Sequence, residues 1–481
     1  MYNIYITKVK NIRPAENADR LNLCEVFGNT TVVDKSVNEN DLYLYLPTDG
    51  QISVEFGEAN NLFRKKDASG NNCGGFVDPI KRNITAIRLR GNKSDGLVLP
   101  LSSLSFFGDI SGLKEGDIVT VFNGHVIAEK YIPRSHAYRN IVTGGNRTRK
   151  KKVPTAPLFK EHADTEQLAY NLGAFKPGDE IEISLKLHGT SQRTGYLPVL
   201  QGYKRSLWDR ITRKEGTPIY DYGYVSGTRR VVLENYEGGF YGNNEFREQH
   251  SKAFEGKLWK GETVYYEVVG FTTSGAPIMA SASNSKLNDK EFIKQYGKET
   301  VFSYGCSPIP NTTILDTKDG NFAEYTPVGP QSDIYVYRMT MTNPDGEVVE
   351  YTPDFMRYRC EQMAVKTVPV FFKGIIPENE DIIYVDKNDN DVCDEGEIAY
   401  VKPINAGEWV MRMAEQFYDG PDPVGKTHVR EGVVVRIINR PKFAAYKHKN
   451  WSFKCLSGIA IADAEASGAT EGMSEDMLAE M

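Results

Sequence analysis

The sequence contains only six cysteines, and no two of them stand in a C-x-x-C arrangement. A zinc knuckle or a dithiol redox motif needs that close spacing, so neither is expected. A chain of 481 residues can bury a core without disulfides, and scattered thiols fit a reducing compartment such as the cytoplasm.

Long apolar runs and internal repeats are missing as well. No stretch approaches the ~18 apolar residues of a membrane helix, and the beginning, M-Y-N-I-Y-I-T-K, carries no signal-peptide pattern. No repeat of about 20–50 residues is visible, which argues against solenoids and propellers. We therefore expect a soluble protein of two or three domains that is neither secreted nor inserted in a membrane.

Acidic residues outnumber basic ones, and the formal net charge is −6. The excess is confined to residues 377–397, with nine acids and one lysine, and residues 459–481, with six acids and no base. The rest of the chain has a net charge of +8, and residues 134–152 contain seven basic residues and no acid. This basic segment suits contacts with phosphates, and it suits a solvated linker equally well.

From residue 2 to about 130, short strand-like runs such as D-L-Y-L-Y-L-P alternate with Gly, Asn and Asp turns, which predicts a small β-barrel. Farther on, strand signals mix with helical periodicity in D-K-E-F-I-K-Q-Y-G, D-F-M-R-Y-R-C-E-Q-M-A-V and G-E-W-V-M-R-M-A-E-Q-F-Y. A capped helix is also predicted in A-D-T-E-Q-L-A-Y-N-L-G-A-F. An α+β domain of antiparallel sheets flanked by helices is expected there.

The predicted organisation has four parts. They are a β-barrel domain at 1–130, a basic linker at 131–154, a mixed domain at 155–458 with an acidic insert at about 377–400, and an acidic C-terminal tail at 459–481.

A lysine stands at the end of a predicted strand, in K-L-H-G-T-S at 186–191. The glycine permits a tight turn, which can present the amine of Lys186 to a cleft as a nucleophile. Alone this pattern is weak, because a surface lysine in a turn looks the same. Four further motifs follow in order: Y-Y-E-V-V-G-F (265–271), I-Y-V-Y-R-M (334–339), E-G-V-V-V-R-I (431–437) and Y-K-H-K-N-W-S-F-K (446–454).

Together these motifs resemble motifs I, III, IIIa, IV and V of the covalent nucleotidyltransferases, which include ATP-dependent ligases and mRNA capping enzymes. The sequence pattern K-x-H-G-T, with a late K-x-K and a Phe four residues farther on, resembles the pattern of the nick-sealing RNA ligases. I-R-P-A-E-N-A-D-R-L-N-L-C-E-V (12–26) and I-R-L-R-G-N-K-S-D-G-L-V-L-P-L (87–101) are similar to the N-terminal OB-fold module of one branch of these ligases. The resemblance implies an OB-like, nucleic-acid-binding domain followed by a nucleotidyltransferase (ATP-grasp-like ligase) domain.

The resemblance also implies the roles of individual residues. Lys186, with Gly189 in the same motif, would attack the α-phosphorus of ATP and form lysyl-AMP. Glu431 would hold Mg²⁺ or Mn²⁺, and Glu267 would contact the ribose, the metal or a water bound to it. The other expected ATP contacts are Arg229, Tyr337, Lys447 and Lys449.

Several choices within the motifs stay open. Tyr335 alternates with Tyr337 on the same predicted strand, and either ring could stack on adenine. Arg338 follows where the family commonly has F-D. Arg229 is favoured over Arg230 as the phosphate contact, and Ser191 stands where related ligases often have Asn. Lys454 is expected to be a salt-bridged surface residue outside the ATP site.

One acidic stretch matches a different kind of site. Asp386, Asn388, Asn390, Asp394 and Glu397 occupy positions 1, 3, 5, 9 and 12 of an EF-hand-type calcium loop. Position 6 lacks the usual glycine, and the flanking I-I-Y-V and I-A-Y-V runs are strand-like, so a solvated acidic hairpin is the favoured interpretation.

The sequence thus predicts an ATP-dependent RNA ligase that seals 3′-OH and 5′-phosphate ends. Its expected partner is RNA with a nick or broken strand, or an RNA/DNA hybrid duplex, with no obligate protein partner. The alternatives are a DNA ligase, a capping-type nucleotidyltransferase, or a non-catalytic RNA-binding protein. Only about 25 residues follow the last motif, which leaves no room for the OB domain that follows it in DNA ligases.

Overall fold

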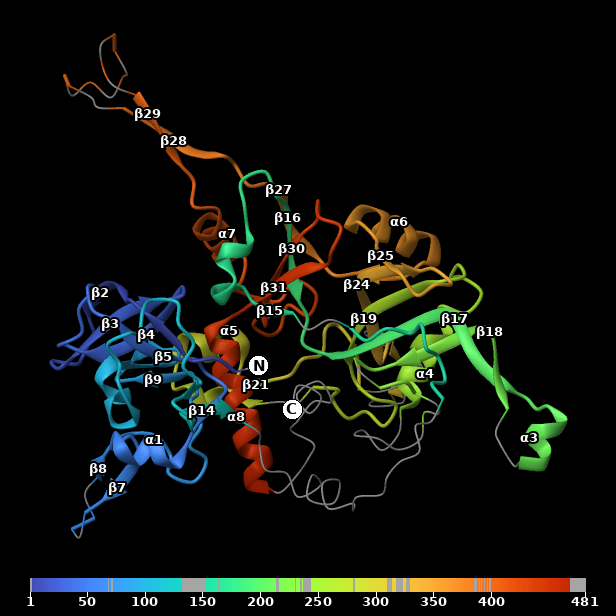
Figure 1. The fold of residues 1–481 in the computed structure, drawn as a ribbon, viewed down its shortest axis with the longest axis horizontal. Helices are drawn as coiled ribbons and strands as arrows, with labels where there is room; N and C mark the ends of the chain where they lie inside the picture. Colours follow the sequence, from blue (N-terminus) through green and yellow to red (C-terminus); the bar gives the residue numbers. More distant parts are fainter. Residues whose placement is uncertain are drawn as a thin grey trace. The chain divides into compact units, whose positions relative to one another are not determined.

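The structure is a computed structural model, and Figure 1 shows its fold. It describes residues 2–67, 69–70, 72–131, 153–162, 165–212, 216–229, 231–233, 236, 244–279, 282–308, 314–316, 323–325, 329–384, 387–388, 390, 392, 394–395, 397 and 399–467. The predicted basic segment at 134–152 lies outside the described residues.

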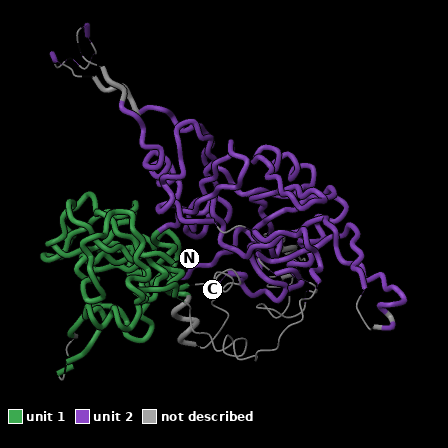
Figure 2. Tube along the Cα trace, in the orientation of Figure 1, with its two compact units in different colours: residues 1–139, 282–298, 451–470 green, residues 140–281, 299–450, 471–481 purple. Residues whose placement is uncertain are grey.

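The chain divides into two compact units (Figure 2). Unit 1 comprises residues 1–139, 282–298 and 451–470, and unit 2 comprises residues 140–281, 299–450 and 471–481. Unit 1 therefore takes in two segments that begin inside the range 155–458. Contacts between distant segments leave no local signal in the sequence, so ranges drawn along the chain could not anticipate them. The separate roles assigned to 1–130 and 155–458 stay a prediction.

Short antiparallel strands build unit 1. Its sheets have the orders β1-β5-β11, β2-β3-β4, β6-β14, β7-β8, β9-β10 and β12-β13. Among the described residues of unit 1 these sheets remain separate, so the predicted closed barrel is not confirmed. The core side chains include Ile4, Ile6, Leu44, Leu46 and Phe56. The strands are β1 (Tyr5–Thr7), β2 (Lys10–Pro14), β3 (Leu21–Val26), β4 (Asn29–Asp34), β5 (Tyr43–Leu46), β6 (Gly50–Ile52), β7 (Arg64–Lys66), β8 (Asn72–Gly74), β9 (Ile87–Leu89), β10 (Asn92–Ser94), β11 (Leu97–Pro100), β12 (Val121–Phe122), β13 (His125–Val126) and β14 (Ala128–Lys130).

The helices of unit 1 come from all three of its segments. They are α1 (Val54–Ala59), η1 (Leu101–Phe107), η4 (Asn284–Leu287), α5 (Lys290–Tyr296) and α8 (Trp451–Ser467), and β20 (Ala282–Ser283) precedes η4. The helical periodicity of D-K-E-F-I-K-Q-Y-G is confirmed by α5, which Asp289 caps by accepting a hydrogen bond from the Phe292 amide.

Helix α8 is attached to unit 1 by polar contacts at its first turn. The indole Nε1 of Trp451 donates to the Ser94 carbonyl, and the Arg88 guanidinium lies over the indole ring. Lys454 Nζ lies 2.6 Å from Asp95 Oδ2, and Lys454 is only 17% exposed. Lys454 is therefore salt-bridged as predicted, but it is half-buried in a helix of unit 1 and is not the surface residue that was expected.

Two larger sheets form unit 2. Their orders are β15-β31-β30-β16-β27 and β18-β17-β19-β24-β25, with β26 added beside β24. Neighbouring strands are antiparallel except for the pairs β15–β31 and β24–β26, so the predicted antiparallel sheets are confirmed. The strands are β15 (Glu166–Gln167), β16 (Glu180–Lys186), β17 (Thr190–Lys204), β18 (Thr217–Gly227), β19 (Glu262–Gly270), β21 (Glu299–Thr300), β22 (Ile314–Asp316), β23 (Ala323–Tyr325), β24 (Ser332–Thr342), β25 (Val348–Glu350), β26 (Lys366–Thr367), β27 (Val370–Ile375), β28 (Asn379–Tyr384), β29 (Ala399–Pro403), β30 (Gly432–Ile437) and β31 (Ala444–Lys449).

Two helices of unit 2 follow the predicted periodicity, and each begins at a residue whose side chain caps it. Thr352 Oγ1 accepts from the Phe355 amide at the start of α6, and Asn405 Oδ1 accepts from the Glu408 amide at the start of α7. The helices are α3 (Leu207–Thr212), α4 (Glu245–Lys252), α6 (Pro353–Met363) and α7 (Ala406–Glu415).

The prediction of a helix in A-D-T-E-Q-L-A-Y-N-L-G-A-F was wrong. The segment forms β15 and two short 3₁₀ turns, η2 (Leu168–Tyr170) and η3 (Leu172–Ala174). Asn171 and Gly173 have low helix propensity, and pairing of Glu166 and Gln167 with β31 extends the first residues instead.

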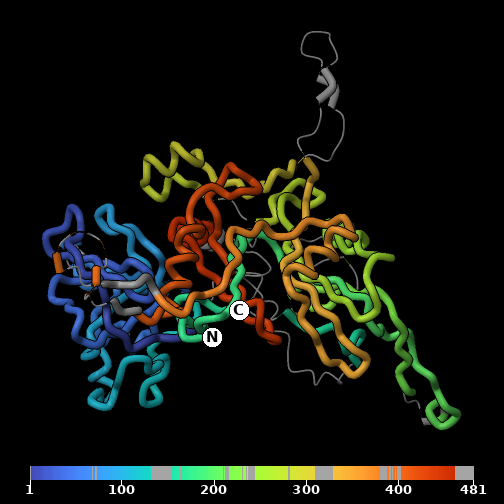
Figure 3. The backbone as a smooth tube through the Cα atoms, turned by 90° about the horizontal axis from the view of Figure 1, so that it is seen from above, coloured from blue at the N-terminus to red at the C-terminus, as the bar shows by residue number. Residues whose placement is uncertain are grey.

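A long two-stranded arm leaves the second sheet. Beyond the part that pairs with β19, strands β17 and β18 continue together as far as the Lys204–Thr217 pair, and α3 joins them. Figures 1 and 3 show this arm reaching away from the rest of unit 2, with α3 at its end.

No helix among the described residues is long and apolar enough to cross a membrane. The five cysteines that the structure describes are free thiols. Strands β28 and β29 pair on both sides of the calcium-loop-like stretch 386–397, as the hairpin interpretation predicted.

Candidate functional site

Six of the side chains singled out in the sequence line one cavity in unit 2. They come from β16, β17, β19, β24 and β31, and from the residues just after β18. The six are Lys186, Ser191, Arg229, Glu267, Tyr337 and Lys447. The fold therefore gathers motifs that span most of unit 2 around a single space.

A buried carboxylate lies beside the first of these residues. Glu431 directly precedes β30, and its Oε1 lies 2.8 Å from Lys186 Nζ and 3.3 Å from Lys449 Nζ. Gly432 pairs with both Lys186 and Lys449, so three strands bring these groups together. A Cβ on Gly432 would lie 2.0 Å from the His448 carbonyl oxygen, which explains why glycine follows the glutamate.

The charges around Glu431 decide its ionisation. Burial raises its pKa, but Lys186, Lys449 and a contact from His188 outweigh burial and hold the pKa well below its usual range. His188 Nδ1 lies 3.4 Å from Glu431 Oε2. Burial lowers the pKa of His188 more than Glu431 raises it, so this imidazole is neutral at physiological pH.

The two lysines of motif V occupy different positions in the site. Lys447 lines the cavity, whereas Lys449 lies at the end of β31 beside Glu431. Both side chains leave the same face of the strand, in agreement with the predicted register.

The turn after Lys186 orients a second glutamate. The Gly189 amide donates to Glu267 Oε1 at 3.0 Å, and the His188 amide donates to Tyr304 Oη at 2.8 Å. A Cβ on Gly189 would lie 2.4 Å from the Val268 carbonyl oxygen and 2.9 Å from Glu267 Cγ. Gly189 thus acts through its backbone, by letting β19 approach closely enough to fix the Glu267 carboxylate.

A β-bulge in β24 separates the two candidate aromatic residues. Tyr265 pairs with Arg338 and Tyr266 pairs with Val336, so Tyr337 is the extra residue. Tyr337 lines the cavity, and its hydroxyl lies 2.9 Å from Ser191 Oγ. Tyr335 is 6% exposed and is not among the lining residues. A bulge re-aims a side chain in this way, and the simple alternation expected for the strand fails there.

The arginine after Tyr337 has structural partners. Arg338 pairs with Glu350, its Nη1 donates to His162 Nδ1 at 3.1 Å, and its guanidinium lies over the Tyr265 ring. His162 lines the cavity 5.2 Å from the Tyr337 ring centroid. Burial, and then the nearby arginines, hold the pKa of His162 well below its usual range, so it accepts the Arg338 hydrogen bond as a neutral base.

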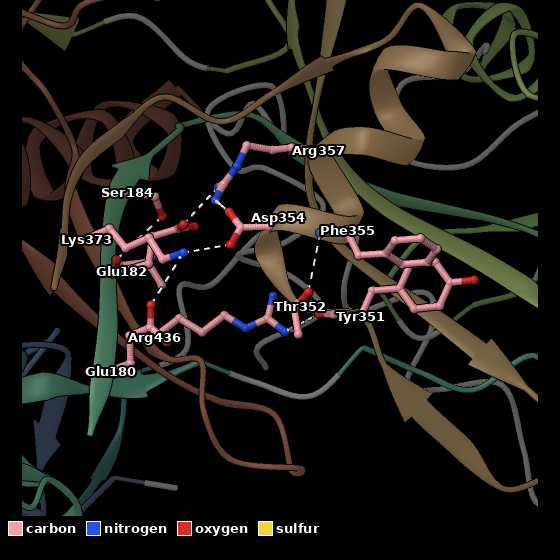
Figure 4. Close-up of polar contacts among 11 residues, drawn as sticks. Glu180, Glu182, Ser184, Tyr351, Thr352, Asp354, Phe355, Arg357, Lys373 and Arg436 are labelled. Atoms are coloured by element: carbon pink, nitrogen blue, oxygen red, sulfur yellow. Dashed lines mark hydrogen bonds and ion pairs between the residues drawn. The ribbon is translucent and has the colours of Figure 1, made fainter. Parts of the chain in front are cut away.

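Charged residues that the sequence reading missed close another part of the cavity (Figure 4). Arg357 Nη1 lies 2.8 Å from Glu182 Oε2, and its Nη2 lies 2.6 Å from Asp354 Oδ1. Asp354 also contacts Lys373 at 2.7 Å. Arg436 Nη2 donates to the Tyr351 carbonyl oxygen. These contacts join the start of α6 to β16, β27 and β30.

A sequence signal existed for one of these residues. Glu182 lies four positions before Lys186 on β16, and period-two alternation puts both on one face of the strand. Arg357 carried no such signal, because only the packing of α6 brings it to β16.

An aromatic layer behind His188 was also missed. The Phe302 ring packs edge-on against His188 at 4.7 Å and against His428 at 5.0 Å between centroids. Tyr304, which accepts from the His188 amide, packs against the same His428 ring at 4.7 Å. This layer gives the turn after Lys186 a rigid support.

Two further expectations concern residues that the structure covers only in part. Arg230 and Asp386 lie outside the described residues. In the acidic hairpin, Asn388 and Asn390 both donate to Asp394 Oδ2. Among the described residues, no group of three His, Cys, Asp or Glu side chains is arranged to hold a metal ion, and calcium binding stays a prediction.

No protein-family model and no curated protein matches this sequence. Solved structures do match. A lysine-to-methionine mutant of Naegleria gruberi RNA ligase with AMP and Mn has a TM-score of 0.50 at 15% identity, covering 94% of this chain and 97% of that chain. Naegleria gruberi RNA ligase with PPi has a TM-score of 0.49 at 16% identity, covering 93% of this chain and 96% of the other. The first likeness shows that this chain has the same fold over nearly its full length.

Proposed function

We propose that this protein is an ATP-dependent RNA ligase of the covalent nucleotidyltransferase superfamily, joining RNA 3′-OH and 5′-phosphate ends through lysyl-AMP. The observation that carries the proposal is the meeting of Lys186, Glu431 and Lys449 beside the cavity that Glu267 and Tyr337 line. A fold shared with an RNA ligase that was solved with AMP and Mn supports it.

The proposed reaction begins at the amine of Lys186. Its nitrogen attacks the α-phosphorus of ATP, the bond to the pyrophosphate oxygen breaks, and the amine loses a proton. AMP then passes to the RNA 5′-phosphate, which frees the lysine. Finally the 3′-OH oxygen attacks that phosphate, and AMP leaves. Glu431 holds the Lys186 amine at 2.8 Å in the resting site, which orients the proposed nucleophile.

The donor set near Lys186 fits Mg²⁺ or Mn²⁺. Glu431 Oε2 is buried and makes no hydrogen bond, although His188 lies nearby, so this carboxylate oxygen can serve as a ligand. Hard divalent ions prefer one or two carboxylates together with waters and phosphates, and Glu267 is the second candidate. When bound, the ion neutralises charge on the triphosphate.

The remaining cavity residues have proposed roles in holding ATP. Tyr337 stacks on adenine, and its hydroxyl is held by Ser191. Arg229 and Lys447 contact phosphates, and Glu267 contacts the ribose or a metal-bound water. Residues 1–130 serve as an OB-like domain that holds RNA, and the basic segment 134–152 adds phosphate contacts. We place the enzyme in the cytoplasm, in RNA repair.

Incubation with α-labelled ATP and Mg²⁺ tests the first step. The label should become attached to the wild-type protein, and Lys186→Ala should abolish the attachment because the substitution removes the proposed nucleophile. Lys176→Ala removes an exposed lysine of the same unit and should label normally. Labelling of Lys186→Ala at the wild-type level would refute the assignment.

Sealing assays separate the proposal from its alternatives. Nicked duplexes with RNA or DNA on each side of the nick should be joined only where the strand ends are RNA. Preference for DNA ends would indicate a DNA ligase. Transfer of a nucleotide to a 5′-diphosphate end without joining would indicate a capping-type enzyme. RNA binding without any labelling would indicate a non-catalytic protein.

A further inference from the structure

The arm formed by β17 and β18 ends in an exposed apolar face. Leu207, Trp208 and Ile211 of α3 are 77%, 74% and 73% exposed. Positions three and four apart are neighbours on a helix surface, so Ile211 lies beside the other two side chains. Apolar surface clustered at a protruding tip is a sign of a binding partner.

Two exposed basic residues precede this face in the chain. Lys204 and Arg205 are exposed at the end of β17. Residues 204–214 contain five basic residues and a single acid, Asp209. That acid is turned back into the helix start, where its Oδ2 accepts from the Ser206 amide at 2.9 Å and from Ser206 Oγ at 2.6 Å. The tip therefore presents apolar and cationic groups, which complement a polyanion whose sugars and base edges offer apolar surface.

The arm connects this tip directly to the candidate active site. Ser191, near the start of β17, lines the cavity, and Lys204 ends the same strand. At ~3.3 Å per residue the two positions are about 40 Å apart along the strand, which exceeds one turn of a nucleic-acid duplex. A duplex is a substrate long enough to reach both places.

Resting on the proposed function, we propose that the α3 tip of the β17–β18 arm is a docking site for duplex RNA about one helical turn or more from the nick. Trp208 and Leu207 pack against exposed sugar and base surface, and Lys204 and Arg205 contact phosphates. Contact with the tip therefore depends on the length of the duplex. Substrates too short to reach the tip lose this contact.

Binding assays on two substrate lengths test this docking site. Nicked double-hairpin RNAs carry either eight or twenty base pairs on each side of the nick, so that only the longer duplex extends beyond one helical turn. Without ATP and metal, the variant Leu207→Ser/Trp208→Ser should bind the long substrate about tenfold more weakly than the wild type. Binding of the short substrate should agree within about twofold.

Charge reversal gives a second readout. Lys204→Glu/Arg205→Glu should flatten the log–log salt dependence of binding by about 0.9 per lost contact, on the long substrate only. Val349→Ser and Lys176→Glu are matched controls, because they alter an exposed apolar and an exposed basic residue elsewhere in unit 2. Both controls should bind like the wild type, and every variant should keep normal label transfer from ATP.

Three outcomes would overturn the docking site. These are equal binding by wild type and tip variants on the long substrate, equal loss on both lengths, and tip-dependent binding to anionic phosphatidylserine vesicles with RNA binding unchanged. Failure of the proposed function would look different, because the wild type would then neither accept the ATP label nor seal nicks.

Discussion

A single glutamate organises the charges of the candidate site. Glu431 is 2% exposed and shares one oxygen with two ammonium groups, Lys186 and Lys449. A buried charge is stable only with partners of the opposite sign, so the carboxylate and the lysines fix one another. The turn at Gly189 extends this order to Glu267.

Gly189→Ala should disable the site through the backbone. The added methyl would lie 2.4 Å from the Val268 carbonyl oxygen, so β17 and β19 must separate and Glu267 must move. We expect label transfer from ATP to fall by at least about tenfold, because a shift of ~1 Å in a reacting geometry can cost more than that.

The matched control is Gly173→Ala. A Cβ there meets no atom within 4 Å, so the methyl group is accommodated. Label transfer by this variant should equal that of the wild type. Full activity in Gly189→Ala would show that the close approach of β19 is not required.

Residue choices were predictable where local spacing decides them. Lys186, Glu431 and Lys449 were singled out from motif patterns, and the structure brings them together because each stands at or beside a strand end. Tyr337 could not be separated from Tyr335, since the bulge that re-aims it depends on pairing with β19.

At the scale of elements, α6 closes the part of the cavity around Glu182. The helix starts at Pro353 after the Thr352 cap, and its second turn carries Arg357 to Glu182. Its periodicity made the helix predictable from sequence. Its position against β16 was not, because Arg357 and Glu182 are 175 residues apart.

Thr352→Ala should weaken both α6 and ATP binding. Loss of the cap hydrogen bond should lower the free energy of unfolding by about 1 kcal/mol, measured by denaturant titration. Because α6 carries Arg357, the KM for ATP in label transfer should rise by a few fold.

Asn405→Ala serves as the comparison. It removes an equivalent cap from α7, none of whose residues lines the cavity. A similar loss of stability with an unchanged KM is expected. If both variants raise the KM equally, general loosening of unit 2 explains the effect and α6 has no special part in it.

At the scale of the whole molecule, several buried or half-buried histidines carry no charge. Burial is the main cause that lowers the pKa of His162, His188, His250 and His428. In the unfolded chain the pKa of each histidine returns to its ordinary value of ~6.5. The unfolded state therefore binds more protons below that pH, and the stability contributed by neutral histidines is lost as the pH falls.

His250 allows this loss to be measured. Its pKa is lowered to about 4, and its Nε2 lies 2.8 Å from Ser332 Oγ. The free energy of unfolding should fall between pH 6.5 and pH 4, by an amount on the order of 2–3 kcal/mol for this group. His250→Gln should show a shallower fall in urea titrations across that range. Parallel pH curves for the two proteins would contradict the assignment.

The two-unit organisation was the least predictable feature. Strand and helix types followed from local patterns, but the assignment of 282–298 and 451–470 to unit 1 depends on contacts such as Lys454 with Asp95. Contacts between residues hundreds of positions apart are set by tertiary packing. Hydrophobic periodicity reports only local structure, so it does not reveal such contacts.

The composition of unit 1 also has a consequence for synthesis on the ribosome. Residues 1–139 emerge first, yet Phe453 and Leu456 of α8, both 1% exposed, are made more than 300 residues later. At ~5–20 residues per second, the nascent unit waits about 15–60 s for its last helix. During that interval the surface that α8 will cover is open to water, so the unit 1 segment made first needs protection from aggregation while unit 2 is translated.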